Sequence, residues 1–431
     1  MKKVGLVSLG CAKNLVDSEN ILGLLDFDKY QIVNNVDDAD IIFINTCGFI
    51  ESSKKESIDT IFEMLSYGKP IVVMGCLVQR YKEELTKEIP EVARFIAIRD
   101  YPHLNDILKE IDDELNETGG VIDQYRKVST GDYSAYLKIG EGCDNCCTYC
   151  AIPLIRGHFV SRPYLDIINE AKLLVDQGYK ELVVLEQDTT KYGIDLHNGE
   201  NIVMLLKGLL EIEGLKYIRL LYLYPDEISD ELIDLIKDNQ ERLTPYFDIP
   251  IQHSEDSILK AMNRRGDKEF LRNLFQRIRN KIPHAVLRTT VMVGFPGETE
   301  KDFKNLKKFI SEIKFDHLGA FTYSREEDTK SYDFPHQVRE STKNRRLKEL
   351  MELQQSISFE NNQKHINEEM TGLIVGEEDG QYLFRSYWNA PDDVDGKIYI
   401  EKTKELKLGD IVTVIIDNAF VYDLVGHLKE K

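Results

Sequence analysis

The sequence predicts an α/β protein with three consecutive regions, and three observations support this. Residues 1–118 alternate apolar, strand-like runs with charged helical segments. Residues 130–360 repeat this alternation six times, and residues 362–431 carry short β-like runs between Gly and Asp turns. Strand–helix alternation is typical of a parallel sheet covered by helices, and short strands with turn residues are typical of small barrels. We therefore expect an N-terminal parallel-sheet α/β domain, a central (β/α) partial barrel and a C-terminal small antiparallel β-barrel.

The expected strands are the apolar runs of each region. In the first domain they are residues 3–10, 40–46 and 70–75. In the central region they are residues 135–140, 181–186, 217–223, 247–252, 287–294 and 317–323. In the last region they are residues 371–387, 397–401 and 411–416. Residues 116–123 (NETGGVID) indicate a linker, and residues 340–365 indicate a helix that leads into the last region.

The composition favours a globular protein of the cytoplasm. Of the 431 residues, 42% are hydrophobic and 30% are charged, which is enough to build a sizeable core. The longest apolar runs, such as residues 41–50, fall well short of the roughly 20 residues of a membrane-spanning helix. Residues 1–14 indicate a first strand and no secretory signal. We expect no membrane partner.

The formal net charge is 55 − 75 = −20. Proteins that bind nucleic acid usually carry a net positive charge, because their Lys and Arg side chains neutralise phosphates. Acidity permits a local basic groove, but it favours a cationic or neutral macromolecular partner.

Four of the seven cysteines lie within the segment 141-EGCDNCCTYCAIPLIRG-157. An odd number with this crowding does not suggest a disulfide framework and indicates metal ligands in a reducing compartment. Cys143, Cys147 and Cys150 form a C-x3-C-x2-C pattern just after an expected barrel strand. Three thiolates on a four-iron cluster leave one iron open, and that iron can chelate the amino and carboxylate groups of S-adenosylmethionine. One-electron reduction then yields a 5′-deoxyadenosyl radical.

A structural zinc site that uses Cys143, Cys146, Cys147 and Cys150 is the alternative. Adjacent cysteines strain a tetrahedral site, and zinc usually takes two ligand pairs from separate segments. We therefore favour the iron–sulfur cluster, with Cys146 as a bystander thiol.

Three further cysteines each follow an apolar strand: Cys11, Cys47 and Cys76. Strand ends of a parallel sheet lie on one edge, so these thiols can converge on a second cluster. Any one of them alone would be interpreted as a small buried hydrophobic residue. Their equivalent positions favour the second cluster.

These motifs resemble the radical-SAM superfamily, and within it the ribosomal-protein aspartate methylthiotransferases (the RimO family). The resemblance covers essentially the whole chain. The segment with Lys13, Asn14 and 17-DSE-19 is its most discriminating part, and Cys146 departs from the usual pattern. The residues that carry the resemblance are 7-VSLGCAKNLVDSEN-20, 45-NTCGFI-50, 141-EGCDNCCTYCAIPLIRG-157, 161-SRP-163, 248-DIPIQH-253, 288-RTTVMVGFPGETE-300 and 386-SYWNAPDDVDG-396.

The resemblance implies two 4Fe-4S clusters and S-adenosylmethionine as both methyl donor and radical source. Cys143, Cys147 and Cys150 would hold the radical-generating cluster. Cys11, Cys47 and Cys76 would hold an auxiliary cluster that carries the sulfur to be inserted. The last region looks like a TRAM module, which usually recognises the macromolecular substrate. The implied reaction places a methylthio group on the β-carbon of an aspartate of small-subunit ribosomal protein S-twelve, with an electron donor such as flavodoxin or ferredoxin.

Several other residues are candidate contacts of S-adenosylmethionine. Tyr149 lies between two cluster cysteines, Gln187 follows a barrel strand, and Gly294 and Gly297 allow a close backbone approach to a ligand. A core position explains Tyr149 equally well, ligand contact is modestly favoured for Gln187, and the two glycines also fit an ordinary turn. His253 is expected to be structural, and Arg345 with Arg346 are expected to lie on a solvated helix face.

Two rival functions remain open from the residues alone. The first is the same chemistry on a tRNA base, and the second is a zinc-stabilised RNA-binding protein without catalysis. Residues 362–431 carry 14 acidic and 8 basic residues, which favours a basic ribosomal protein over tRNA. Asp392, Asp393 and Asp395 are the residues we expect to contact that partner, with a solvated turn as the alternative.

Overall fold

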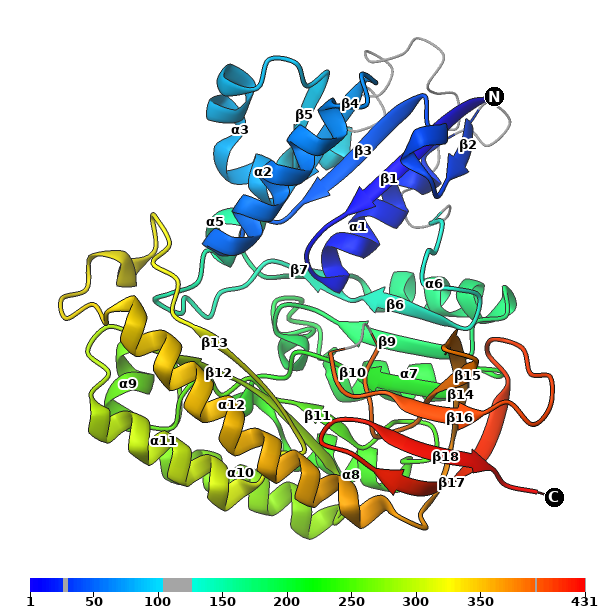
Figure 1. Cartoon of the computed structure of the whole chain (residues 1–431), viewed down its shortest axis with the longest axis vertical. Coiled ribbons are helices and arrows are strands. Elements are labelled where there is room, and N and C mark those ends of the chain that lie inside the picture. The colour runs from blue at the N-terminus through cyan, green and yellow to red at the C-terminus, as the bar shows by residue number, and fades with distance from the viewer. Residues whose placement is uncertain (26–29, 104–125, 392–393, 431) are drawn as a thin grey trace. The chain divides into compact units, whose positions relative to one another are not determined.

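The computed structural model describes residues 1–25, 30–103, 126–391 and 394–430 (Figure 1). They form two compact units. The described residues of Met1–Ser129, Gly140–Val160 and Ser324–Tyr332 make the first unit, and those of Thr130–Ile139, Ser161–Tyr323 and Asp333–Lys431 make the second. The expected linker, residues 116–123, lies outside the described residues. No helix among the described residues is long and apolar enough to cross a membrane.

The first unit contains a five-stranded parallel sheet with the strand order β2-β1-β3-β4-β5. The strands are β1 (Lys2–Ser8), β2 (Tyr30–Val33), β3 (Ile41–Thr46), β4 (Ile71–Gly75) and β5 (Arg94–Ala97). The three expected strands are confirmed as β1, β3 and β4. The strands β2 and β5, which are only four residues long, were not predicted from the sequence.

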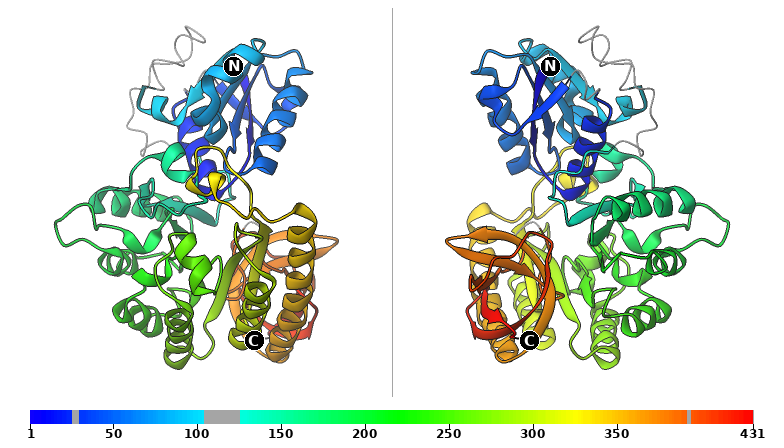
Figure 2. Two further views of the ribbon diagram at one scale, coloured as in Figure 1. Left: turned by 90° about the vertical axis from the view of Figure 1, so that its left-hand side faces the viewer. Right: turned by 90° about the vertical axis from the view of Figure 1, so that its right-hand side faces the viewer.

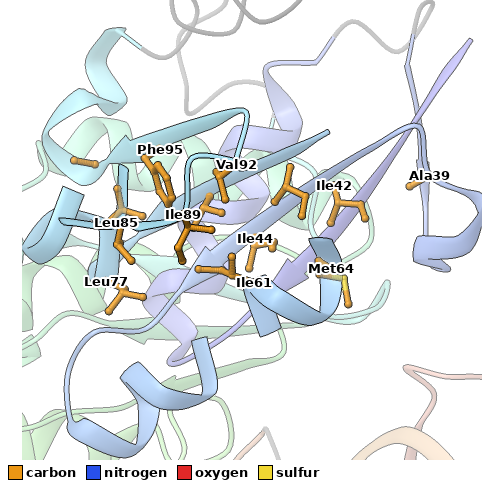
Figure 3. Close-up of a cluster of buried hydrophobic side chains, with 14 residues drawn as sticks. Ala39, Ile42, Ile44, Ile61, Met64, Leu77, Leu85, Ile89, Val92 and Phe95 are labelled. Atoms are coloured by element: carbon orange, nitrogen blue, oxygen red, sulfur yellow. The ribbon is translucent and has the colours of Figure 1, made fainter. Parts of the chain in front are cut away.

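Helices cover both faces of this sheet: α1 (Ala12–Gly23), α2 (Glu51–Leu65) and α3 (Cys76–Glu88). Because successive strand residues point to opposite faces, β3 contributes Phe43 to the core beneath α1 and contributes Ile42 and Ile44 to the core beneath α2 and α3. Figure 3 shows the second of these cores, where Leu77 and Leu85 of α3 meet the sheet. Burial on both faces explains the almost uninterrupted apolar runs of the strands. The first unit also contains β7 (Gly140–Glu141) and α5 (Ile152–Arg156).

The second unit contains six parallel strands in two sheets of three. The first sheet has the order β10-β9-β6, with β6 (Ser134–Lys138), β9 (Glu181–Leu185) and β10 (Tyr217–Leu220). The second has the order β11-β12-β13, with β11 (Tyr246–Asp248), β12 (Val286–Val293) and β13 (His317–Thr322). A parallel bridge between Ile218 and Leu243 links β10 to the start of the second sheet. All six expected strands are present, so the (β/α) partial barrel is confirmed.

Helices cover the outer side of these strands (Figure 2). In α11, Thr299 and Asp302 form a capping box at the start, and Lys314 ends the helix in the left-handed conformation. The helices are α6 (Tyr164–Asp176), α7 (Ile202–Leu210), α8 (Asp230–Asp238), α9 (Asp256–Ala261), α10 (Lys268–Lys281), α11 (Glu300–Ile313) and α12 (Glu340–Asn362). The expected connecting helix is confirmed as α12. A two-residue strand, β8 (Val160–Ser161), precedes α6.

The C-terminal region of the second unit is a closed five-stranded barrel with the order β14-β15-β16-β18-β17. The strands are β14 (Glu369–Glu378), β15 (Gln381–Arg385), β16 (Ile398–Glu401), β17 (Ile411–Ala419) and β18 (Leu424–Leu428). The expected small barrel is confirmed with one correction. The β16–β18 pair is parallel, so the barrel is mixed and not purely antiparallel. Parallel closure by β18, a strand that sequence analysis missed, accounts for the difference.

Buried charges join this barrel to the amino-terminal ends of the core strands. Glu181, the first residue of β9, contacts Arg385 of β15 at 2.5 Å and Arg219 of β10 at 3.3 Å. Arg219 also donates to the Ser386 carbonyl oxygen at 2.7 Å. Burial alone would raise the pKa of Glu181, but the two guanidinium groups outweigh burial and hold the pKa below its ordinary value.

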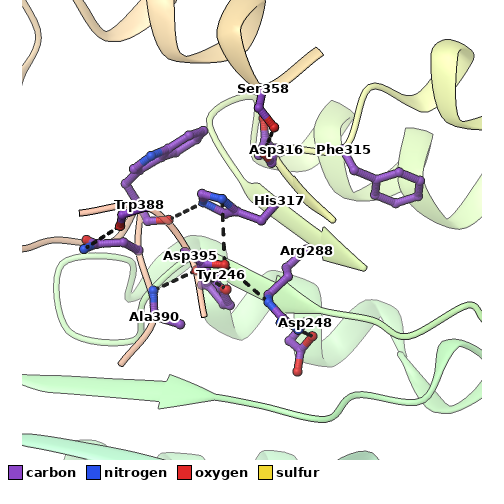
Figure 4. A network of polar contacts seen from close by, with 12 residues as sticks. Tyr246, Asp248, Arg288, Phe315, Asp316, His317, Ser358, Trp388, Ala390 and Asp395 are labelled. Atoms are coloured by element: carbon purple, nitrogen blue, oxygen red, sulfur yellow. Dashed lines mark hydrogen bonds and ion pairs between the residues drawn. The ribbon is translucent and has the colours of Figure 1, made fainter. Parts of the chain in front are cut away.

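A second buried network involves Asp395 (Figure 4). Its carboxylate accepts hydrogen bonds from the Tyr246 hydroxyl at 2.6 Å and from the Ala390 amide at 2.9 Å, and it lies 3.3 Å from Arg288. The side chain of Asp395 has no exposed surface. His317, at the start of β13, contacts the Trp388 carbonyl oxygen at 2.8 Å.

These contacts correct one expectation. Asp395 was expected to meet a basic protein partner, but its carboxylate is buried and paired within the second unit. Asp392 and Asp393 lie outside the described residues. Since residues at the amino-terminal face of a (β/α) barrel usually serve stability, we interpret residues 385–391 and 394–396 as a structural plug of the core.

Replacement of Arg385 tests this interpretation. Arg385→Met leaves the buried Glu181 carboxylate with Arg219 as its remaining charged partner, so we expect a loss of about 3 kcal/mol in the free energy of unfolding. Lys207→Met is the control, because Lys207 pairs with Glu231 on the surface and should cost about 1 kcal/mol or less. Urea unfolding of both variants measures the difference. Equal stabilities would show that the plug does not support the core.

Candidate active site: two cysteine triads

The strand order of the first unit places two cysteines at a topological switch point. In the order 2-1-3-4-5, the crevice at the carboxyl ends of β1 and β3 is the place where ligands bind in open α/β sheets. Cys11 follows β1 as the N-cap of α1, Cys47 directly follows β3, and Cys76 directly follows β4 as the first residue of α3. The three thiols therefore lie along one edge of the sheet.

The thiols are close enough to influence one another's ionisation. The pKa of Cys76 is raised to about 11, mainly by burial, with Arg156 opposing this shift and Cys11 and Cys47 adding to it. Burial also raises the pKa of Cys47, and Cys11 adds to this shift. At neutral pH these two groups are thiols, so metal binding there must release protons.

A glycine makes room for this triad. Gly10 has a φ of +94°, which favours glycine, and a Cβ at this position would lie 3.0 Å from the Cβ and 3.3 Å from the Sγ of Cys47. A side chain at residue 10 would therefore fill the space beside the Cys47 thiol.

Asn14 of α1 connects the loops that carry the three cysteines. Its side-chain amide donates to the carbonyl oxygens of Leu9 and Thr46, each at 3.1 Å. Its Oδ1 accepts from the Cys76 thiol at 3.3 Å and also from Arg156. Asn45 in turn donates to the Asn14 carbonyl oxygen at 2.7 Å. Asn14 of α1 is buried because its side chain forms hydrogen bonds with these loops.

The second triad also lies in the first unit. The Cys143 amide donates to the Gly157 carbonyl oxygen at 3.2 Å, and the Cys150 amide donates to the Cys147 carbonyl oxygen at 3.0 Å. Burial raises the pKa of Cys150, and Cys147 and Cys143 add to this shift. Cys146 differs from these three because it is exposed.

Arg156, at the end of α5, connects this segment to the first triad. Its guanidinium lies 2.6 Å from Asp17 and 2.9 Å from Glu141. It donates to Asn14 and, at 3.5 Å, to the Cys76 thiol. The side chain of Arg156 is only 1% exposed, so these groups replace water as its partners.

The candidate contacts of S-adenosylmethionine are divided between the units. Tyr149 belongs to the first unit, whereas Gln187, Gly294 and Gly297 belong to the second. Gln187 follows β9, and the two glycines follow β12 with φ values of 77° and 86°. Carboxyl ends of parallel barrel strands form the ligand-binding face, so these three residues share that face.

Two residues that sequence analysis did not single out as site residues hold the Gly294 loop. Glu298 accepts hydrogen bonds from the amides of Gly294 and Phe295. Arg346 of α12 lies 3.1 Å from the Glu298 carboxylate. Arg346 was expected on a solvated face, but it is buried because it pairs with this carboxylate, whereas Arg345 is exposed and pairs with Glu300 and Glu349.

The donor atoms of the two triads are thiol sulfurs, which are typical ligands of iron–sulfur clusters. No three or more His, Cys, Asp or Glu side chains among the described residues are placed to hold one metal ion. Ligands of zinc must all approach one centre at about 2.3 Å, whereas a four-iron cluster takes each thiolate on a separate iron. Each triad supplies three thiols, which is the donor chemistry such a cluster requires.

Family models match three consecutive segments of the chain. Residues 3–97 match the uncharacterized protein family UPF0004, residues 137–310 match the Radical SAM superfamily, and residues 366–428 match the TRAM domain. Together these segments contain both triads, the Gly294 loop and the closed barrel.

Relatives of full length share one name, ribosomal protein uS12 methylthiotransferase RimO. The protein from Thermoanaerobacter sp. (strain X514) is 46% identical, over 99% of this chain and 100% of that protein. The one from Clostridioides difficile (strain 630) is 47% identical over 99% of both chains. The one from Aquifex aeolicus (strain VF5) is 48% identical over 99% of this chain and 98% of its own. The chain belongs to the RimO family.

Solved structures support the fold at low identity. The radical S-adenosylmethionine methyltransferase TsrM from Kitasatospora setae has a TM-score of 0.54 at 13% identity, over 95% of this chain and 84% of its own. The cobalamin-dependent S-adenosylmethionine radical enzyme OxsB has a TM-score of 0.51 at 14% identity, over 82% of this chain and 56% of its own.

In this RimO-family chain, Arg156 provides a direct test of the link between the triads. Arg156→Met removes the guanidinium that pairs with the buried Asp17 carboxylate at 2.6 Å, so we expect a loss of about 3–5 kcal/mol in the free energy of unfolding. The double variant Arg156→Met/Asp17→Asn should recover part of that loss, because it also removes the buried negative charge. Urea unfolding of the two single variants and the double variant measures the coupling. Additive losses would contradict a direct interaction.

His253 provides a pH-dependent prediction. Burial lowers its pKa to about 3, and its Nδ1 accepts a hydrogen bond from the Glu255 amide at 3.0 Å. The His253 imidazole takes up a proton near pH 6.5 in the unfolded chain but only near pH 3 in the folded chain. The free energy of unfolding therefore keeps its full contribution from neutral His253 above about pH 6.5 and loses it as the pH falls toward 3. His253→Asn should therefore lose less thermal stability than the wild type between pH 7 and 5. Parallel pH profiles of the two proteins would be the contrary result.

Proposed function

We propose that this RimO-family chain is a radical-SAM methylthiotransferase that adds a methylthio group to the β-carbon of an aspartate of ribosomal protein uS12. The main support for this proposal is that full-length relatives at 46–48% identity are named ribosomal protein uS12 methylthiotransferase RimO. The gathering of Cys11, Cys47 and Cys76 at one sheet edge supports the same conclusion, because sulfur insertion needs a second thiol-ligated site besides the radical-generating one.

In this proposal two 4Fe-4S clusters are bound by the thiols of the two triads. Cys143, Cys147 and Cys150 hold one, and the other triad holds the second. When bound, the clusters and S-adenosylmethionine supply a 5′-deoxyadenosyl radical, a sulfur atom and a methyl group. Tyr149, Gln187, Gly294 and Gly297 are the proposed contacts of S-adenosylmethionine.

The chain's own residues position and protect these groups. Asn14 fixes the loops of Cys11, Cys47 and Cys76 through the hydrogen bonds described above. Arg156 holds α5, and with it the segment of the second triad, against Asp17. Glu298 accepts a hydrogen bond from the amide of Gly294 and so fixes the loop that approaches the ligand. Burial of Cys47 and Cys76 excludes water from the thiols.

The proposed macromolecular partner is a basic protein and not tRNA. The chain carries a net charge of −20, and residues 362–431 have a balance of 8 − 14 = −6. A Lys/Arg-rich ribosomal protein is attracted to such a surface, whereas phosphates are repelled. An electron donor such as flavodoxin or ferredoxin completes the set, and a ribosomal substrate implies the cytoplasm.

Cysteine variants test the two-cluster arrangement. Anaerobically reconstituted wild type should hold about eight irons, four for each cluster. Replacing Cys11, Cys47 and Cys76 with Ala should halve the iron and preserve reductive cleavage of S-adenosylmethionine. Cys147→Ala should abolish that cleavage, whereas the matched neighbour variant Cys146→Ala should preserve both iron and cleavage. Full iron in the triple variant would contradict the second cluster, and loss of cleavage in Cys146→Ala would contradict the choice of ligands.

A substrate comparison tests the assignment of the partner. Reconstituted enzyme with S-adenosylmethionine and a reductant is incubated with unmodified uS12 and, separately, with unmodified tRNA. Mass spectrometry should find a methylthio group on an aspartate of the protein and none on the tRNA. The reverse result would overturn the protein substrate and leave the radical chemistry intact.

A further inference from the structure

The first unit has a groove between α2 and α3 whose floor is apolar. The facing stripes of the two helices line a space of about 630 Å³. Phe62, near the end of α2, is 55% exposed and extends the apolar surface of the floor toward solvent. The apolar lining residues are Ile58, Phe62, Leu77, Leu85 and Ile89. We refer to this space as the α2–α3 groove.

The rim of the α2–α3 groove is acidic. Its charged lining residues are Glu51, Lys54, Lys55, Glu84, Glu88 and Glu327. The two lysines are already paired. Lys54 lies 2.8 Å from Glu51 and 3.0 Å from Glu326, and Lys55 lies 3.4 Å from Asp59. On α3, Glu84 has no ion-pair partner among the described residues, and Glu88 has only a 3.8 Å contact with Lys87. The α3 side of the rim therefore presents uncompensated negative charge.

The two helices that line the groove also hold loops of the first cysteine triad. Leu77 of the floor directly follows Cys76. Ser57 of α2 accepts a hydrogen bond from the Cys47 amide and donates to the Cys47 carbonyl oxygen, each at 3.0 Å. A partner seated in the groove therefore contacts the two helices that carry Cys76 and hold the Cys47 loop, the residues from which we propose the sulfur is delivered.

We propose that the α2–α3 groove docks the basic protein substrate, with an apolar side chain on the floor and flanking Lys or Arg residues on the acidic rim. This inference rests on the proposed function. The charge of the rim decides among occupants. An acidic electron carrier would meet like charge, and a second copy of this chain would oppose one acidic rim with another, whereas a Lys/Arg-rich ribosomal protein is complementary.

Charge reversal on the rim tests the proposal against a matched control. Glu84→Lys/Glu88→Lys reverses two lining residues. Glu63→Lys/Glu83→Lys makes the same change of net charge with exposed residues of the same two helices that do not line the groove. All four substituted residues are exposed, so the iron content and thermal unfolding of both variants should equal those of the wild type. Methylthiolation of uS12 is assayed with dithionite as reductant, so that no electron-carrier protein takes part.

In the rim variant, KM for uS12 should rise about tenfold at low salt, and the difference should shrink as salt screens the charges of the wild type. In the control variant KM should change less than twofold. Phe62→Gln should also raise KM, but with little dependence on salt, because it removes an apolar contact.

Two results would overturn the docking site: an unchanged KM in the rim variant, or an equal rise in the control variant. An unchanged KM together with slower reduction by flavodoxin, measured in a separate assay without dithionite, would assign the groove to the electron donor. Failure of the proposed function is distinct from these, because the wild type itself would then leave uS12 unmodified.

Discussion

The buried guanidinium of Arg156 is the constraint on which the arrangement of the thiols depends. Its partners come from α1, from the Glu141 segment and from the start of α3. A guanidinium removed from water is stable only if all its donors find acceptors in good geometry. Displacement of any one of these segments leaves the charge unsatisfied. One side chain thus fixes the distance between the segment of the second triad and the loops of the first.

The polar residues of α1 show the same principle on a smaller scale. Asn14, Asp17 and Glu19 are buried on a helix that also covers one face of the sheet. Asp17 pairs with Arg156, and Glu19 pairs with Arg126, each at 2.6 Å. Buried polar groups of this kind specify one arrangement of loops, since each has few alternative partners. The helix therefore both completes the core and positions the cysteine loops.

Much of this could be predicted from the sequence, because strands and their ends are local features. Cys11, Cys47 and Cys76 each follow an apolar run, and this alone predicted a shared edge. The strand order could not be predicted, because pairing between parallel strands is set by contacts far apart in the chain. The burial of Asp395 and Arg346 was missed for a related reason. A charged residue in a loop or on a helix is expected to face solvent unless a buried partner is known. The partners of Asp395 and Arg346 lie 107 and 48 residues away in the sequence.

The plug formed by residues 385–391 and 394–396 has a consequence for how such a protein can evolve. A terminal module joined by a linker can be lost or exchanged between proteins without harm to its neighbour. Here the closed barrel supplies Arg385 to a carboxylate at the start of β9 and Asp395 to a guanidinium of β12. An exchanged module would have to bring matching charges to the same places. Recombination at this boundary is therefore restricted, and the barrel and the (β/α) core must be inherited together.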